Sequence, residues 1–167
     1  IMVKKIVFFS FSPIVKQYHL KRFGVELLKD NGFEVLVFDF SPIVFPVLHN
    51  NVIHRIEKIT SEDYFLFSDE KKAIKAIHEL GEDCFVVVIG YYQLQSFKIY
   101  RALSKTNIPY AAWATGVDPF GGVTSSESLL WKIFFKFKRF NLNKLKNILY
   151  KPLMAPALGI RHPDICV

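Results

Sequence analysis

The sequence has few of the residues that build metal or redox sites. Its 167 residues include only two cysteines, Cys84 and Cys166, and neither has a partner at a CxxC spacing. No pair of histidines, cysteines or carboxylates has a metal-ligand spacing. We therefore interpret both cysteines as buried free thiols, and we predict no bound metal and no cofactor.

Long apolar runs are also absent. Charge interrupts every apolar stretch well before the roughly 18 residues that a membrane span requires, and no charged-then-apolar signal peptide opens the chain. We therefore expect a cytoplasmic protein. The composition, with 51% hydrophobic and 22% charged residues, is that of a folded chain, and the length suits one domain.

Acidic residues are missing from one segment, residues 131–151. Seven of the 22 basic residues lie there, which leaves 15 basic and 15 acidic residues elsewhere, so this segment carries the whole net charge of +7. Residues 126–151 also have a broad apolar stripe at helical spacing, which predicts a basic amphipathic helix in contact with an anionic membrane surface. The residues expected to bind the membrane are Trp131, Lys132, Lys136, Lys138, Arg139, Lys144 and Lys146.

The basic segment has two other interpretations. It could be a helix that packs on the core and leaves a solvated basic face. Nucleic-acid binding is not expected, because no recognition motif accompanies the charge.

Residues 3–40 organise the fold. They contain two short β-rich apolar runs, at residues 3–9 and 34–40, around one amphipathic helical run that ends at about Asn31, before Gly32. Both runs are apolar almost throughout and do not alternate, as in strands with helices on both faces, so we predict a doubly wound α/β domain with a mainly parallel sheet. The apolar residues expected to face the sheet from the helix are Leu20, Phe23, Val25, Leu27 and Leu28.

The strand-helix order continues along the chain. Residues 63–67 are ambiguous, and residues 165–167 resemble the opening of a strand, so we expect the natural protein to continue past Val167. The other expected elements are an apolar loop or short turn at 41–46, a short strand at 52–56, a helix capped by Asp69, a buried strand at 85–90, a helix at 94–106 and a strand at 110–114.

Three loops follow the predicted strands, at residues 10–13, 90–92 and 115–122. The carboxyl ends of parallel strands lie at one edge of a sheet, and open α/β sheets bind their ligands at that edge. We therefore expect the three loops to share one ligand site.

The opening unit resembles a known family. The residues that carry the resemblance are Lys5-Ile6-Val7-Phe8-Phe9, the Ser-Pro loop, Tyr18-His19-Leu20-Lys21-Arg22-Phe23-Gly24, Asn31-Gly32-Phe33-Glu34-Val35, Asp39-Phe40-Ser41-Pro42 and Pro163-Asp164-Ile165-Cys166-Val167. They resemble the amino-terminal domain of bacterial polysaccharide-biosynthesis glycosyltransferases with the GT-B architecture, which has two Rossmann-like domains.

The resemblance implies that residues 1–167 form a single Rossmann-like, acceptor-side domain. A carboxyl-terminal half, absent here, would hold most of the nucleotide-sugar donor site. The implied activity is hexosyl transfer from a nucleotide sugar to a lipid-linked or other glycan acceptor, and this half alone would be inactive. Residues 10–18 contain no glycine, unlike many relatives, which argues against phosphate contact at the first loop.

Candidate site residues come from the expected loops and the first helix. Asp118 could act as the general base that accepts a proton from an acceptor hydroxyl, or it could simply form a turn before Pro119. His19 and Arg22 are expected to begin the first helix and to contact phosphate, with a solvated surface role as the alternative. The full set of predicted substrate-binding residues is Ser10, Ser12, His19, Arg22, Tyr91, Thr115 and Gly116.

Two further interpretations concern function. Asp39 ends the second predicted strand, as does the acid that holds a ribose in dinucleotide enzymes, but the glycine-rich turn of such a site is missing. The alternative to a glycosyltransferase is a non-catalytic α/β module that docks on an anionic membrane or a protein partner through the basic helix. With either function, we expect peripheral attachment at the inner face of the cell membrane.

Overall fold

Six parallel strands form one sheet in a computed structural model that describes residues 3–14, 17–55, 59, 61–90, 94–113, 159–161 and 163–166. The order across the sheet is β3-β2-β1-β4-β5-β6, and every neighbouring pair is parallel. The predicted doubly wound, Rossmann-like α/β fold is therefore confirmed. The strands are β1 (Lys5–Ser10), β2 (Glu34–Asp39), β3 (Tyr64–Leu66), β4 (Cys84–Ile89), β5 (Tyr110–Trp113) and β6 (Ile165–Cys166).

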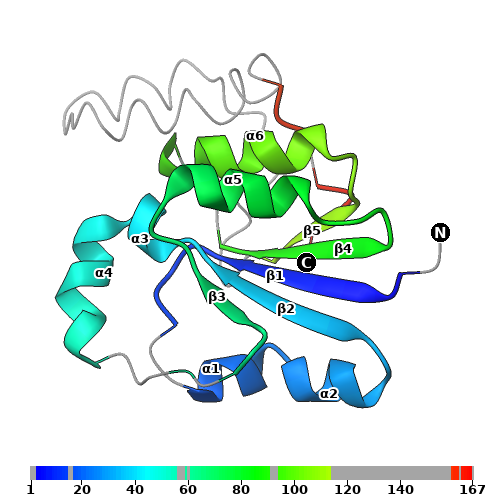
Figure 1. The fold of residues 1–167 in the computed structure, drawn as a ribbon, viewed down its shortest axis with the longest axis horizontal. Helices are drawn as coiled ribbons and strands as arrows, with labels where there is room; N and C mark the ends of the chain where they lie inside the picture. The colour runs from blue at the N-terminus through cyan, green and yellow to red at the C-terminus, as the bar shows by residue number, and fades with distance from the viewer. Residues whose placement is uncertain are drawn as a thin grey trace, which may run out of the picture.

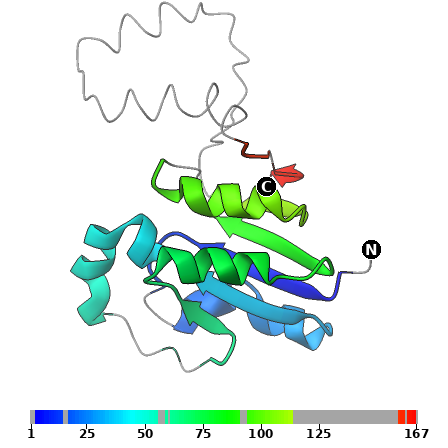
Figure 2. The same ribbon diagram turned by 45° about the horizontal axis from the view of Figure 1, so that its top comes forward.

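Helices cover both faces of the sheet (Figure 1). α1 (Gln17–Arg22) and α2 (Val25–Asp30) lie on one face, whereas α5 (Glu70–His78) and α6 (Phe97–Lys105) lie on the other. Figure 2 shows the same two layers after a turn of the molecule. The shorter helical elements are α3 (Ser41–Val44), α4 (Pro46–Val52), η1 (Ile53–Arg55) and η2 (Leu94–Ser96).

Successive strand side chains enter different cores. Phe9 belongs to a buried cluster with Ile77 of α5 and Leu103 of α6, and its neighbour Phe8 belongs to a second cluster with Val25 of α2. Because each strand residue meets one of two apolar layers, the strands read as continuous apolar runs in the sequence.

The segment between β1 and β2 is not one continuous helix, which corrects the sequence expectation. α1 ends at Arg22 and α2 begins at Val25, because Gly24 between them has a left-handed φ of 73° that interrupts a right-handed helix. The break changes the helical phase. Val25 is buried, whereas Leu27, which was expected to face the sheet, is 66% exposed.

Most of residues 41–55 are also helical where other structure was expected. Pro42 and Pro46 lie in the first turns of α3 and α4, where proline loses no intrahelical hydrogen bond, so the expected loop is wrong. The expected strand at 52–56 is also wrong, since Val52 ends α4 and η1 follows. The edge strand on this side is β3, in the stretch that the sequence left ambiguous.

The other predicted elements that fall within the described residues are confirmed. Asp69 caps α5, and its carboxylate accepts hydrogen bonds from the backbone N–H groups of Lys71 (2.7 Å) and Lys72 (3.1 Å). β4, η2 with α6, and β5 occupy the predicted strand, helix and strand. Cys84 is a buried free thiol, as predicted, and its burial raises the pKa of the thiol.

The described helices are all short. None of those in the described ranges has the length and apolar character needed to cross a bilayer. The predicted basic helix at 126–151 lies outside the described residues.

Candidate functional site at the edge of the sheet

The direction of the chain across the sheet reverses between β1 and β4. From β1 the chain proceeds to β2 and β3 on one side, whereas β4 leads to β5 and β6 on the other side. Open α/β sheets bind ligands outside the carboxyl ends of the strands at such a reversal. Ser10 of β1 pairs with Ile89 of β4, so the loops that follow these strands begin side by side. We call this place the switch-point edge.

The loop after β1 is held in place by its own hydrogen bonds. The Ser10 hydroxyl is buried and donates to the carbonyl oxygen of Ser12 (2.9 Å). Phe11 and Ile14 are buried as well, whereas Ser12 is exposed. Of the two predicted serines, Ser10 therefore shapes the loop, and Ser12 is the one whose side chain faces solvent and is open to a ligand.

Gly90 forms the other side of the switch-point edge. Its φ of 113° lies in the region that side chains rarely adopt, and its N–H donates to the carbonyl oxygen of Trp113 (3.1 Å). A Cβ atom at this position would lie 3.9 Å from the ring of Phe11, so there is space for a methyl group but not a favourable backbone geometry. Glycine is needed here for the turn that leaves β4 beside the β1 loop.

Asp39, at the carboxyl end of β2, ties three segments of this edge together. Its side chain is 1% exposed, and its oxygens accept hydrogen bonds from Ser41 N–H (2.8 Å), Ile14 N–H (3.2 Å) and the Tyr64 hydroxyl (2.8 Å). Burial, together with the Asp39 charge, raises the pKa of Tyr64. Because three protein donors already engage both oxygens, Asp39 positions the β1 loop, α3 and β3 and is not placed to hold a ribose.

A second buried polar pair fixes α4 beside this edge. The hydroxyl of Ser41 lies 3.0 Å from Nδ1 of His49, and both side chains are buried. The hydrogen bond joins the first residue of α3 to the middle of α4. Sequence reasoning missed this pair, because two polar residues eight apart in a stretch that was not expected to be helical give no periodic signal.

The structure places four of the predicted substrate-binding residues. Ser10 and Ser12 lie at the switch-point edge, as expected. His19 is the third residue of α1, but Arg22 is its last, so the N-terminus of the helix cannot explain a phosphate contact by Arg22. The predicted residues outside the described ranges are Tyr91, Thr115, Gly116, Asp118, Trp131, Lys132, Lys136, Lys138, Arg139, Lys144 and Lys146.

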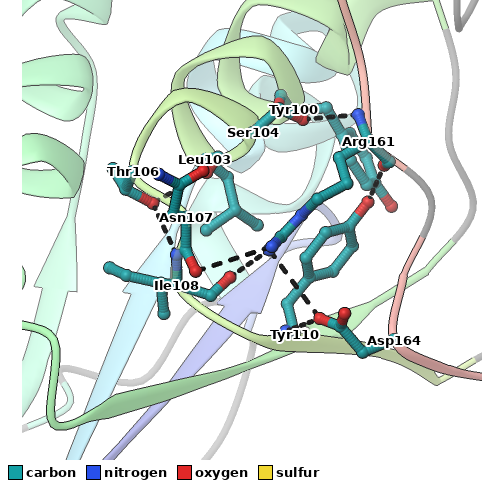
Figure 3. Close-up of polar contacts among 9 residues, drawn as sticks. All are labelled: Tyr100, Leu103, Ser104, Thr106, Asn107, Ile108, Tyr110, Arg161 and Asp164. Atoms are coloured by element: carbon teal, nitrogen blue, oxygen red, sulfur yellow. Dashed lines mark hydrogen bonds and ion pairs between the residues drawn. The ribbon is translucent and has the colours of Figure 1, made fainter.

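A polar cluster with many contacts surrounds Arg161, at the amino ends of β5 and β6 (Figure 3). The guanidinium donates to the carbonyl oxygens of Ile108 and, at 3.5 Å, Asn107, and its centre lies 5.3 Å from the centroid of the Tyr110 ring. It also lies 3.7 Å from the carboxylate of Asp164. These groups follow the C-terminus of α6 and begin β5, where the backbone would otherwise leave carbonyls unpaired.

The backbone of Arg161 is held as well. Its N–H donates to the hydroxyl of Ser104 (2.9 Å), and its carbonyl accepts from the hydroxyl of Tyr110 (Figure 3). Asp164 accepts from the N–H of Tyr110 (2.9 Å), just before β6 pairs with β5. The cluster therefore fastens the chain segment that leads into β6, and it lies away from the switch-point edge.

Among the described residues, no three histidine, cysteine or carboxylate side chains come together as a ligand set for a metal. Comparison of the chain with protein-family models, with curated proteins and with solved structures finds no match. The function must therefore be inferred from the fold, the switch-point edge and the sequence pattern.

Proposed function

We propose that this chain is the acceptor-side half of a GT-B glycosyltransferase of cell-surface polysaccharide biosynthesis. The whole enzyme would transfer a sugar from a nucleotide-sugar donor to a lipid-linked or other glycan acceptor. One observation carries the proposal. The strands have the order of a dinucleotide-binding domain, but the loop after β1 lacks the features of a dinucleotide site.

Two features of the switch-point edge support an acceptor over a dinucleotide. The loop after β1 contains no glycine from residue 10 to residue 18, so its backbone is not suited to a close approach of phosphate. Asp39, at the position of the ribose-binding acid, is already engaged by three protein donors. An edge of this kind suits neutral hydroxyl groups, which a sugar acceptor provides.

The proposed roles follow from the loops at this edge. Ser12, exposed on a loop that Ser10 and Asp39 hold in place, would donate to or accept from an acceptor hydroxyl. Asp118, which follows β5 in the sequence, would take the proton of the attacking hydroxyl as the acceptor oxygen bonds to the sugar and the bond from the sugar to the nucleotide phosphate breaks, so that the nucleotide leaves with the electron pair of that bond. The donor would be held by the second half of the enzyme, so this half alone is expected to show no turnover.

A ligand-dependent thermal shift tests the proposal. Lipid-linked sugars and nucleotide sugars would be titrated against the 167-residue chain, and saturable stabilisation is expected with a lipid-linked sugar, because a ligand that binds only the folded state stabilises it. Ser12→Trp should abolish that stabilisation by blocking the exposed loop. Glu82→Trp, which introduces the same indole at an exposed residue near the opposite end of β4, should leave it unchanged.

Two results would refute the proposal. One is no saturable stabilisation by any lipid-linked sugar or nucleotide sugar, which would favour the alternative of a binding module docked through the basic segment 131–151. The other is stabilisation that Ser12→Trp and Glu82→Trp reduce equally, which would place the ligand away from the switch-point edge.

A further inference from the structure

α4 and η1 form a helical arm with an unusual concentration of exposed apolar side chains. We call these residues, Pro46–Val52 and Ile53–Arg55, the apolar arm. Val47 is 73%, Leu48 46% and Ile53 55% exposed. Single exposed apolar residues are ordinary on protein surfaces, but three within seven positions of one short element form a patch.

The arm carries almost no charge. No Asp, Glu, Lys or Arg occurs from residue 40 to residue 54, and Arg55 is the first charged residue after Asp39. The apolar side chains are also not on a frayed end, because the buried hydrogen bond between His49 and Ser41 fixes α4 to α3. The protein therefore holds an uncharged apolar surface in a defined position.

The position of the arm is informative. α3 begins two residues after Asp39, the last residue of β2, so the arm extends from the edge of the sheet where the strands end (Figures 1 and 2). The switch-point edge is the same edge, since β1 and β2 are parallel and Ser10 pairs with Asp39. A surface that binds the arm would therefore lie beside the proposed acceptor site.

We propose that the apolar arm inserts Val47, Leu48 and Ile53 into the interface of an anionic lipid bilayer. The proposal rests on the proposed function, because a lipid-linked acceptor is presented at a membrane surface. Apolar insertion supplies one attachment signal, and the seven basic residues of segment 131–151, with no acid among them, supply the second. Peripheral attachment generally needs two such signals, since one alone is marginal.

A bilayer suits the arm better than a second copy of the chain. Three partly exposed side chains offer a few hundred Å², whereas a stable protein interface buries roughly 800 Å² on each partner. The absence of carboxylates from residues 40–54 also avoids repulsion by anionic headgroups. The arm has the composition of a shallow membrane contact and too little area for a dimer.

Co-sedimentation with vesicles tests the proposal. The probe is phosphatidylcholine vesicles that contain phosphatidylglycerol, with no sugar present. Combined replacement Val47→Ser, Leu48→Ser and Ile53→Ser is expected to lower the partition coefficient at least tenfold, because insertion of each of these partly exposed side chains changes it severalfold. The matched pair is Leu48→Ser, which should weaken binding severalfold, and Leu27→Ser, which should not weaken it although Leu27 of α2 is the more exposed of the two leucines (66% against 46%).

A second measurement stays decisive even if the triple variant folds poorly. An environment-sensitive fluorophore would be attached to Leu48→Cys or to Leu27→Cys in a Cys166→Ser background, where Cys84 is buried and does not react. Addition of vesicles is expected to shift the emission to the blue for the probe at position 48 only.

Three outcomes would overturn the proposal. They are a wild-type chain that does not bind the vesicles, equal binding by the triple variant and Leu27→Ser, and a dimer in sedimentation that the triple variant abolishes. The proposed function is tested separately by sugar-dependent stabilisation without vesicles, so either one can fail while the other holds.

Discussion

Replacement of Arg161 by methionine tests whether this guanidinium holds the segment that leads into β6. Methionine keeps most of the aliphatic bulk and removes every donor and the charge. The backbone contacts of Arg161 with Ser104 and Tyr110 would remain, so only the interactions of the side chain are lost. The expected result is a less stable protein with the same fold.

The magnitude follows from the contacts that the side chain makes. The charged hydrogen bond to Ile108 contributes about 1.5 kcal/mol, and the 3.5 Å contact with Asn107 about 0.5 kcal/mol. The contact with the Tyr110 ring adds about 0.5–1 kcal/mol. The ion pair with Asp164 adds at most about 0.5 kcal/mol, because water reaches both side chains, which are 33% and 46% exposed.

One term opposes this loss. Nε of Arg161 is buried and has no hydrogen-bond partner among the described residues, so its removal relieves about 1 kcal/mol. The net expectation is a decrease of about 2 kcal/mol in the free energy of unfolding, which corresponds to roughly 4–8 °C in the melting temperature of a chain of this size.

Urea denaturation of the 167-residue chain measures this difference. Arg101→Met is the matched control, because it removes the same charge from an exposed residue of α6 whose guanidinium lies 5.9 Å from the centroid of the Phe97 ring. It should change the free energy of unfolding by less than about 1 kcal/mol. If Arg161→Met and Arg101→Met differed by less than about 0.5 kcal/mol, the side chain of Arg161 would not fasten the segment as described.

Three further predictions concern buried or capping groups. Asp39→Ala should lower the free energy of unfolding by about 3 kcal/mol or more, since three donors lose their acceptor; a loss below about 1 kcal/mol in urea denaturation would contradict the network. Tyr64→Phe should have a lower free energy of unfolding than wild type at pH 8, and the difference between the two should become smaller above about pH 10. The raised pKa of Tyr64 means that the unfolded wild-type chain releases its proton first, so its stability falls as pH rises; a constant gap would refute this. Asp69→Asn should be less stable than wild type near neutral pH, and the difference in stability should become smaller below about pH 4. The N–H groups of Lys72 and Lys71 lower the pKa of Asp69, so the ionised carboxylate stabilises the folded chain above that pH, and this stabilisation is lost when the carboxylate is protonated. Thermal melts of both proteins across this pH range would detect the change.

Buried strands and well-capped helices could be predicted from the local pattern of residues in the sequence. β4 is a run of apolar residues, and Asp69 followed by the spacing of Ala73 and Ile77 identifies α5, because burial on two faces and helix capping each leave a signal within a few residues. The break at Gly24 was missed, since glycine within a helical pattern does not show its φ angle in advance.

Elements and contacts that depend on residues distant in the sequence could not be predicted from the local pattern. β3 has only three residues and is a strand because β2 offers it a free edge. The hydrogen bond of Asp39 to Ile14 joins residues 25 apart, and the contacts of Arg161 reach back more than 50 residues. Sequence periodicity carries no information over such separations, so these networks could not be predicted.

The sequence by itself determined the α/β class, the parallel sheet and the edge at which a ligand is expected, because alternating strand and helix patterns allow few other arrangements. It also determined the segregation of positive charge into residues 131–151. The tertiary structure decided which residues at that edge are free to act. It assigned Ser10 and Asp39 to holding the loop, left Ser12 exposed, and placed the apolar arm beside them. Burial and hydrogen-bond occupancy arise only when distant segments pack, and they separate a structural polar residue from one that can bind a ligand.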